Sequence, residues 1–119
     1  MEYRGISIHT NNVPGLVGFY SKVLRSRAEG DDVHSAFAEF NLAIWNPGNI
    51  NQKKFEKSKK YFTLMFEVDN VDNEYERLKN LDIQIDFVSE PTTYPWGARA
   101  FSFKDPDGNN IDFLSTVKQ

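Results

Sequence analysis

The sequence has 119 residues and no cysteine, with a formal net charge of −3 and a pI near 5.3. The negative charge argues against nucleic acid or an anionic membrane as a partner, because both carry the same sign of charge. Without cysteine there is no disulfide, no thiolate nucleophile and no thiolate metal site. The N-terminus does not read as a signal peptide and no stretch is long and apolar enough for a membrane span, so we expect a soluble, cytoplasmic protein.

Hydrophobic residues make up 39% of the chain and aromatic residues 14%. A chain of this length and composition can form one domain with a real core. Because ten Phe, five Tyr and two Trp are many for so small a core, we expect some of these rings to line a pocket.

The first predicted elements are a strand and a helix between residues 5 and 24. Ile6 and Ile8 alternate with small or polar residues, which is the period of a half-buried strand. Asn11 or Asn12 is suited to cap a helix, and proline is favoured in a first helical turn. Apolar side chains then recur at helical spacing, at Leu16, Phe19, Tyr20, Val23 and Leu24.

The same order of strand, cap and helix recurs from residue 61 onward. Alternating apolar residues precede a possible cap at Asp69 or Asn70, and a helical stripe follows at Val71, Tyr75, Leu78 and Leu81. "TNNV" at 10–13 matches "VDNV" at 68–71 with an offset of 58 residues. The chain is therefore predicted to be an internal repeat.

The segments after each helix also correspond. Residues 27–31 and 83–90 would supply the strand that follows each helix, and residues 35–48 read as two short strands. Residues 98–115 read as two strands joined by Asp-Pro-Asp-Gly, a strong turn signal. The prediction is a single α+β domain over 1–119 that contains two β-α-β-β-β modules, at 1–48 and 59–119, joined by a polar linker at 49–58.

Four stretches of the sequence resemble the vicinal oxygen chelate superfamily, which includes glyoxalase I, extradiol dioxygenases and the fosfomycin and bleomycin resistance proteins. They are "NVPGLVGFY" at 12–20, "FEVDNVDNEYERL" at 66–78, "PWGARAF" at 95–101 and "DPDGNNIDF" at 105–113. The resemblance covers nearly the whole chain. It implies two modules whose strands form a curled mixed sheet around a cup, the glyoxalase/bleomycin resistance-like fold. It also implies a homodimer, since members of this family often complete their cups across chains.

Strand alternation assigns the side chains of each strand to one of two faces. One set is expected to pack under the helices: Ile6, Ile8, Phe62, Leu64 and Phe66. The other set is expected to face the cup: Gly5, Ser7, His9, Tyr61, Thr63, Met65 and Glu67.

In the last hairpin, a pairing of Lys104 with Asn110 would place Ser102 opposite Asp112, with both side chains facing the cup. The same pairing puts four apolar residues in the core: Phe101, Phe103, Ile111 and Phe113. By the repeat, Trp45 faces the cup as well.

The resemblance implies four metal-ligand positions, which fall on Gly5, Ala43, Thr63 and Asp112. One carboxylate among them is too few for a catalytic divalent ion, which takes about three protein ligands. We therefore expect no metal and no other cofactor. A displaced site made of His9, Glu67 and Asp112 stays open as an alternative, although His9 lies about 13 Å along the strand from the position that the family uses. His34 is expected to be a solvated loop residue.

The expected cup combines aromatic and polar side chains: His9, Trp45, Tyr61, Met65, Glu67, Ser102 and Asp112, with Trp96 in a loop over the mouth. Such a lining suits a planar or amphipathic small molecule, and two carboxylates favour a cationic group. The main hypothesis is a glyoxalase/bleomycin-resistance-like protein that binds a small molecule without a metal. The alternatives are a metal-dependent lyase or dioxygenase with an atypical metal site, and a dimer that serves regulation or interaction.

Overall fold

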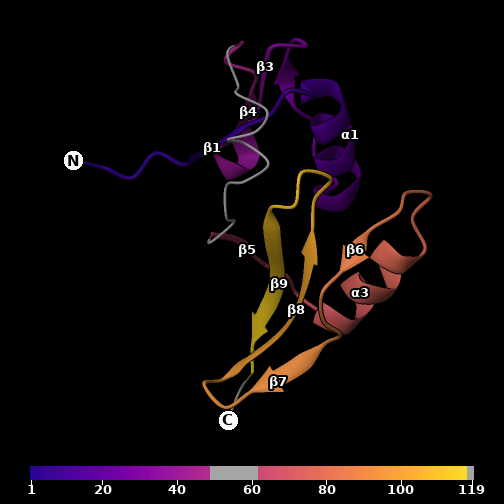
Figure 1. The fold of residues 1–119 in the computed structure, drawn as a ribbon. Coiled ribbons are helices and arrows are strands. Elements are labelled where there is room, and N and C mark those ends of the chain that lie inside the picture. Colours follow the sequence, from indigo (N-terminus) through magenta and orange to yellow (C-terminus); the bar gives the residue numbers. More distant parts are fainter. Residues whose placement is uncertain (49–61, 118–119) are drawn as a thin grey trace. The chain divides into compact units, whose positions relative to one another are not determined.

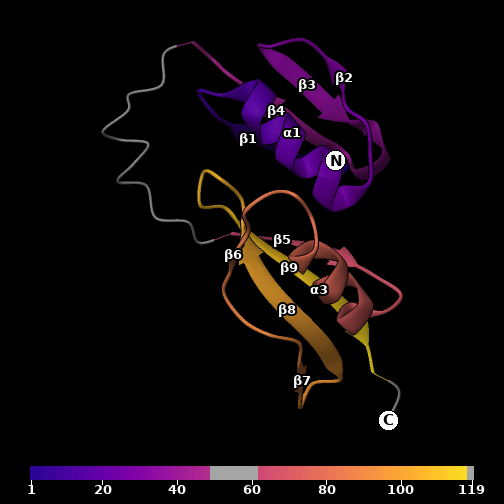
Figure 2. The same cartoon turned by 90° about the vertical axis from the view of Figure 1, so that its right-hand side faces the viewer.

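The computed structural model describes residues 1–48 and 62–117. The chain divides into two units, Met1–Lys59 and Lys60–Gln119. In the described residues, each unit has one mixed β-sheet and one α-helix (Figure 1, Figure 2). The predicted linker at 49–58 lies outside the described residues, and so does Tyr61. No helix in the described ranges is both long and apolar enough to cross a lipid bilayer.

The first unit contains four strands, one α-helix and a short 3-10 turn. In chain order they are β1 (Ile6–His9), α1 (Val13–Leu24), β2 (Glu29–Gly30), β3 (His34–Phe37), η1 (Ala38–Phe40) and β4 (Leu42–Trp45). The strand order in the sheet is β1-β4-β3-β2. β1 runs parallel to β4, and the other pairs are antiparallel.

The second unit repeats this plan with one additional strand. Its elements are β5 (Thr63–Glu67), α3 (Val71–Lys79), β6 (Asp86–Phe87), β7 (Thr92–Tyr94), β8 (Ala98–Lys104) and β9 (Asn110–Thr116). The strand order is β5-β9-β8-β6, and β7 also pairs with β8. β5 runs parallel to β9, as β1 does to β4. The predicted fold class, α+β with two β-α-β-β-β modules, is confirmed.

The strand predicted at 83–90 is interrupted in the structure. β6 covers Asp86–Phe87, and β7 begins only at Thr92. Between them, the amides of Val88 and Ser89 both donate to the carbonyl of Ser102, at 2.8 and 3.2 Å. Two residues of one strand thus lie opposite a single residue of β8. This is the arrangement of a β-bulge, which breaks the regular ladder at this point.

The two helix starts are equivalent and confirm the offset of 58 residues. Asn12 caps α1 by accepting a hydrogen bond from the amide of Gly15 at 3.1 Å. Asn70 caps α3 in the same way, accepting from the amide of Asn73 at 3.0 Å. Each cap satisfies one of the backbone donors that a helix leaves without an internal partner.

The core of the first unit lies between α1 and one face of its sheet. The helix buries Val13, Leu16, Phe19, Tyr20 and Val23, which recur at helical spacing. The sheet contributes Ile8, Phe37, Leu42 and Ile44. The rings of Tyr20 and Phe37 meet with their centroids 6.4 Å apart.

The core of the second unit is a cluster of aromatic rings. Tyr75 of α3 contacts Phe87 and Phe101, with centroid distances of 5.1 and 5.2 Å. Phe103 and Phe113 join this cluster through ring contacts of 5.2 to 6.3 Å. Aromatic side chains from α3, β6, β8 and β9 therefore form most of this core.

Phe62 was expected in the core, and this expectation is wrong. Its side chain is 82% exposed, and it lies just before the first residue of β5. The alternation of apolar residues therefore extends one step beyond the strand, to a side chain that is exposed.

The turn between β8 and β9 is held by the carboxylate of Asp105, which is 4% exposed. Its Oδ1 accepts from the amides of Asp107 and Asn109, each at 2.9 Å, and its Oδ2 accepts from Nδ2 of Asn109 at 2.8 Å. Gly108, with φ of +87°, takes the left-handed conformation that glycine adopts without steric cost. The "DPDGN" motif is therefore structural, and it leads into the pairing of Lys104 with Asn110, as predicted.

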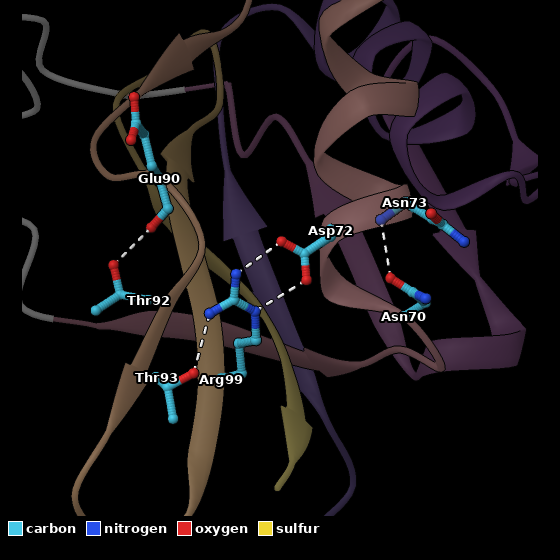
Figure 3. A network of polar contacts seen from close by, with 7 residues as sticks. All are labelled: Asn70, Asp72, Asn73, Glu90, Thr92, Thr93 and Arg99. Atoms are coloured by element: carbon cyan, nitrogen blue, oxygen red, sulfur yellow. Dashed lines mark hydrogen bonds and ion pairs between the residues drawn. The ribbon is translucent and has the colours of Figure 1, made fainter.

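An ion pair joins the start of α3 to β8. Arg99 Nε and Nη2 donate to Oδ2 and Oδ1 of Asp72, at 2.9 and 2.7 Å, and Nη1 donates to Oγ1 of Thr93 at 2.9 Å (Figure 3). The hydrogen bond from Arg99 lowers the pKa of Asp72, and the same bond raises the pKa of Arg99. The guanidinium thus fastens the first turn of the helix to two neighbouring strands.

We expect Asn12→Ala and Asn70→Ala each to lower the free energy of unfolding by about 1 kcal/mol, because each removes a helix cap. Asn12→Asp and Asn70→Asp keep a side-chain acceptor and should lose much less. Urea unfolding followed by circular dichroism measures all four variants. Equal losses for the alanine and aspartate variants would contradict the capping role.

Asp105→Ala should lower the free energy of unfolding by about 1–3 kcal/mol, since it leaves the amides of a tight turn without their acceptor. Asp105→Asn keeps an oxygen at the position of Oδ1 and should cost less. The same urea titrations compare the two variants. A loss in Asp105→Asn as large as in Asp105→Ala would show that the backbone hydrogen bonds are not what stabilises the turn.

The Asp72–Arg99 pair predicts a pH dependence of stability. Because the folded-state pKa of Asp72 is below its unfolded value, the pair stabilises the fold above the ordinary carboxyl range and loses this effect as the pH falls. Asp72→Asn should lower the thermal midpoint at pH 7, and its difference from wild type should shrink on acidification to about pH 3 and in high salt.

Glu76→Gln is the matched control for Asp72→Asn. Glu76 is an exposed acid on the same helix, paired with Lys79 at 3.4 Å, and such exposed pairs contribute little. A pH profile of Asp72→Asn that runs parallel to wild type at every pH would be evidence against the coupling.

Candidate functional site

The candidate site of the second unit lies on the face of its sheet that points away from α3, which we call the distal face. The helix packs on β8 and β9 (Figure 2). Four buried residues define the helix side: Phe101, Phe103, Ile111 and Phe113. Because side chains alternate along a strand, Ala100, Ser102 and Asp112 lie on the distal face.

Asp112 stands in a row of three side chains that runs across this face. It lies opposite Ser102 of β8 on one side and Met65 of β5 on the other. The hydroxyl of Ser102 donates to Oδ1 of Asp112 at 2.6 Å, and both residues are half-buried. Within residues 1–48 and 62–117, the Asp112 side chain has no other polar contact, so Oδ2 stays available to a ligand. The predicted pairing of Ser102 with Asp112 is confirmed.

Ser102 is held in place by the bulge between β6 and β7. Its amide donates to Oγ of Ser89 at 3.0 Å, while its carbonyl accepts from the amides of Val88 and Ser89. Ser89 was not among the predicted site residues, because its segment was read as a regular strand. Pro91, two residues later, was the available sign that the strand is broken, since proline cannot donate to a ladder.

Charged side chains surround the row on the distal face. Glu67 of β5 is exposed and lies one side-chain position beyond Met65, which is itself 69% exposed. Asp86 and Lys104 lie opposite each other on β6 and β8. Three carboxylates and one ammonium therefore share this face, so it favours a cation.

The first unit carries a second row of predicted residues on the face of its sheet away from α1. His9 and Trp45 lie opposite each other on β1 and β4, and their rings meet edge to face with centroids 5.2 Å apart. His34 was expected in a loop, and this is wrong. It is the first residue of β3 and lies opposite Trp45 on the other side. The alternation in "HSAF", with buried Ser35 and Phe37, was the signal for this strand.

Trp96 lies in the turn between β7 and β8. Its ring stacks on that of Tyr94, with centroids 4.7 Å apart and planes 12° from parallel. Ala98, where β8 begins, is four residues before Ser102, or about 13–14 Å along the strand. Within its unit, therefore, Trp96 lies well away from the Asp112 carboxylate.

Three of the four metal-ligand positions are occupied by residues that fit a metal poorly, and the fourth is the carboxylate of Asp112. Gly5 has φ of +142°, and a Cβ added there would lie 2.2 Å from the carbonyl oxygen of Asn41. Ala43 lies beside Ser7, and Thr63 is exposed beside Asn110. Among the described residues, no group of three or more His, Asp or Glu is placed to hold a metal ion. The donor set therefore does not match the one that the family resemblance implies.

Comparison with solved structures places the fold among known ones. One, a conserved domain protein, has a TM-score of 0.80 at 24% identity over 98% of this chain and 99% of its own. A glyoxalase/bleomycin resistance protein/dioxygenase from Nocardioides gives 0.76 at 22% identity over 99% and 85%. A member of the same superfamily from Sphaerobacter thermophilus DSM 20745 gives 0.71 at 20% identity over 97% and 98%. At these identities the likeness establishes the fold alone.

The sequence itself establishes the family. No curated protein matches it, but the glyoxalase-like domain model matches residues 6–118. The match spans both units, including the caps, the turn at Asp105 and the row at Asp112. The chain therefore belongs to the glyoxalase-like domain family, within the vicinal oxygen chelate superfamily.

Proposed function

We propose that this protein binds a small molecule with a cationic group, and that Asp112 on the distal face of the second sheet is the anchor for that group. The observation that carries the proposal is the hydrogen bond from Ser102 to Oδ1 of Asp112. A core carboxylate would be expected under the helix, whereas this one lies on the opposite face, in line with exposed Met65.

The arrangement suits an ionic hydrogen bond. Ser102 fixes the carboxylate on the sheet, so little side-chain freedom is lost when a ligand binds. A cation that meets a half-buried carboxylate forms a charge-assisted hydrogen bond, which is roughly twice as strong as a neutral one. Glu67 adds negative charge on the same face, and the charge of Asp86 is offset by Lys104 opposite it. The sum over the face is negative, which favours a cation over an anion.

The family's metal positions support binding without a metal. The backbone of Asn41 occupies the space that a side chain at position 5 would need. Ala43 has no ligating atom, and Asp112 is the one carboxylate among the four positions. These residues leave too few donors for a catalytic ion, which takes about three protein ligands.

Two further features belong to this proposal. His9 and Trp45 form an edge-to-face pair on the first sheet, and we propose this pair as a separate aromatic ligand surface of the first unit. We propose a homodimer as the functional form, in line with the habit of the superfamily, and sedimentation at micromolar concentration tests it. A monomer under those conditions would speak against the dimer without bearing on Asp112.

The binding proposal is tested with aromatic amines and the neutral alcohols of the same carbon skeleton. Amines should raise the thermal midpoint more than their alcohols, in the presence or absence of EDTA. Asp112→Asn keeps the shape, removes the charge, and should weaken amine binding by about 1.5–3 kcal/mol, or roughly 10–100-fold in Kd. Isothermal titration measures the constants, and Glu76→Gln on α3 is the control acid.

Two results would overturn the proposal. One is equal binding of amines and alcohols, or no binding of either. The other is one equivalent of Zn, Fe, Mn or Ni in freshly purified protein that is lost in Asp112→Asn, which would favour a metal-dependent lyase or dioxygenase instead.

A further inference from the structure

The turn between β7 and β8 presents a pair of stacked rings to solvent. Trp96 is 75% exposed, yet one of its faces is covered by Tyr94 at a centroid distance of 4.7 Å. The turn is fixed by the amide of Gly97, which donates to the carbonyl of Tyr94 at 3.1 Å. The amide of Val117 in turn donates to the carbonyl of Gly97 at 2.8 Å. The exposed ring is thus held in a set orientation.

The strand register puts Tyr94 on the distal face, together with Asp112, and the ring of Trp96 stacks on that of Tyr94. Tyr94 lies opposite Ala98, whereas Thr93 lies opposite Arg99, whose side chain binds Asp72 on the helix side. Tyr94 is therefore on the same face as Ala98, and Ala98 shares its face with Ser102 by alternation along β8.

Small and apolar side chains lie between the two ends of this face. From the turn toward Ser102, β8 presents Ala98 and then Ala100. Thr116 and Leu114 of β9 lie opposite them on one side, and Thr92 of β7 lies opposite Ala100 on the other. Alanine has no side-chain atom beyond Cβ, so these positions form a low, apolar floor. The floor spans four residues of β8, about 13–14 Å, and has the aromatic pair at one end and the carboxylate at the other.

We infer that the distal face binds an elongated ligand, with a flat ring stacked on Trp96, an apolar spacer over the two alanines and a cationic group at Asp112. This inference rests on the proposed function, because it takes the Asp112 end from it. A ring stacked on an exposed, oriented indole gains contact area at little cost in side-chain freedom. Linking the two ends makes the second contact intramolecular, so the joined ligand binds more tightly than either part.

The inference is tested with naphthylalkylamines of increasing linker length, beside plain alkylamines of the same lengths. In wild type, the affinity of the naphthyl series should rise with linker length beyond that of the alkylamines, until the ring reaches Trp96. Trp96→Ala should weaken the long naphthyl members about three- to tenfold and leave the alkylamines and the short members unchanged. Trp96→Phe should restore much of the loss.

A direct spectroscopic measurement locates the ring. The chain has two tryptophans, so the difference in indole fluorescence between wild type and Trp96→Phe isolates the signal of Trp96. Long naphthylamines should quench this signal or shift it, and alkylamines should not. Because Trp96 is exposed, its replacement should leave the far-UV circular dichroism of the protein unchanged.

The outcomes separate this inference from the proposal beneath it. If no amine binds in a manner that Asp112→Asn weakens, the proposed function fails. If amines bind through Asp112 but the naphthyl series shows neither a length dependence nor an effect of Trp96→Ala, the ring subsite alone is refuted. The same holds if Trp96 fluorescence does not respond to the long members.

Discussion

In the part of the chain that the structure describes, each sheet has two faces and one α-helix of its own unit to cover them. The helix covers one face, and the alternation of side chains along every strand then decides which residues are buried beneath it. This constraint sends Phe101 and Phe113 to the core and their neighbours Ser102 and Asp112 to the distal face. A shift of one residue in the pairing of β8 with β9 would exchange the buried and the distal side chains. The turn at Asp105 leads into this pairing, so it also determines which residues form the site.

The cores between helix and sheet are built from different side chains in the two units. In the first unit a helix rich in apolar residues covers a sheet of mostly aliphatic ones. In the second, α3 buries just Val71 and Leu78 fully, and aromatic rings from the sheet supply most of the core. The polar surface of α3 is correspondingly larger, and the pair of Asp72 with Arg99 fastens one end of it to β8.

Periodicity and turn chemistry were sufficient to predict most of this fold. Both caps, the pairing of Ser102 with Asp112 and the repeat of strand order follow from local patterns with a known physical cause. The residues that were predicted wrongly are those whose structure depends on neighbours outside the local sequence pattern. Phe62 continues an alternation past the end of the strand, His34 begins a strand whose only sign was the short "HSAF", and the bulge at Ser89 depends on a partner strand.

The candidate site was predictable to a lesser degree for the same reason. Side-chain parity gave the face of Asp112, but the sequence does not show that Ser89 holds Ser102 or that Trp96 stacks on Tyr94. These contacts join segments that do not follow a common period. The identity of the residues at a ligand position is visible in a sequence, whereas the space available to them is not.

At Gly5 the available space, which the sequence does not show, decides which residue can occur. This has an evolutionary consequence. Its left-handed φ and the nearby carbonyl of Asn41 exclude a side chain, and Asn41 itself has a positive φ of 52°. A single exchange of Gly5 for histidine would therefore not restore a ligand, because the bend before β4 would have to be rebuilt at the same time. A histidine ligand at position 5 would require at least two coordinated changes, one at Gly5 and one in the bend at Asn41. The backbone at this point of the fold thus limits which substitutions at position 5 can be accepted one at a time.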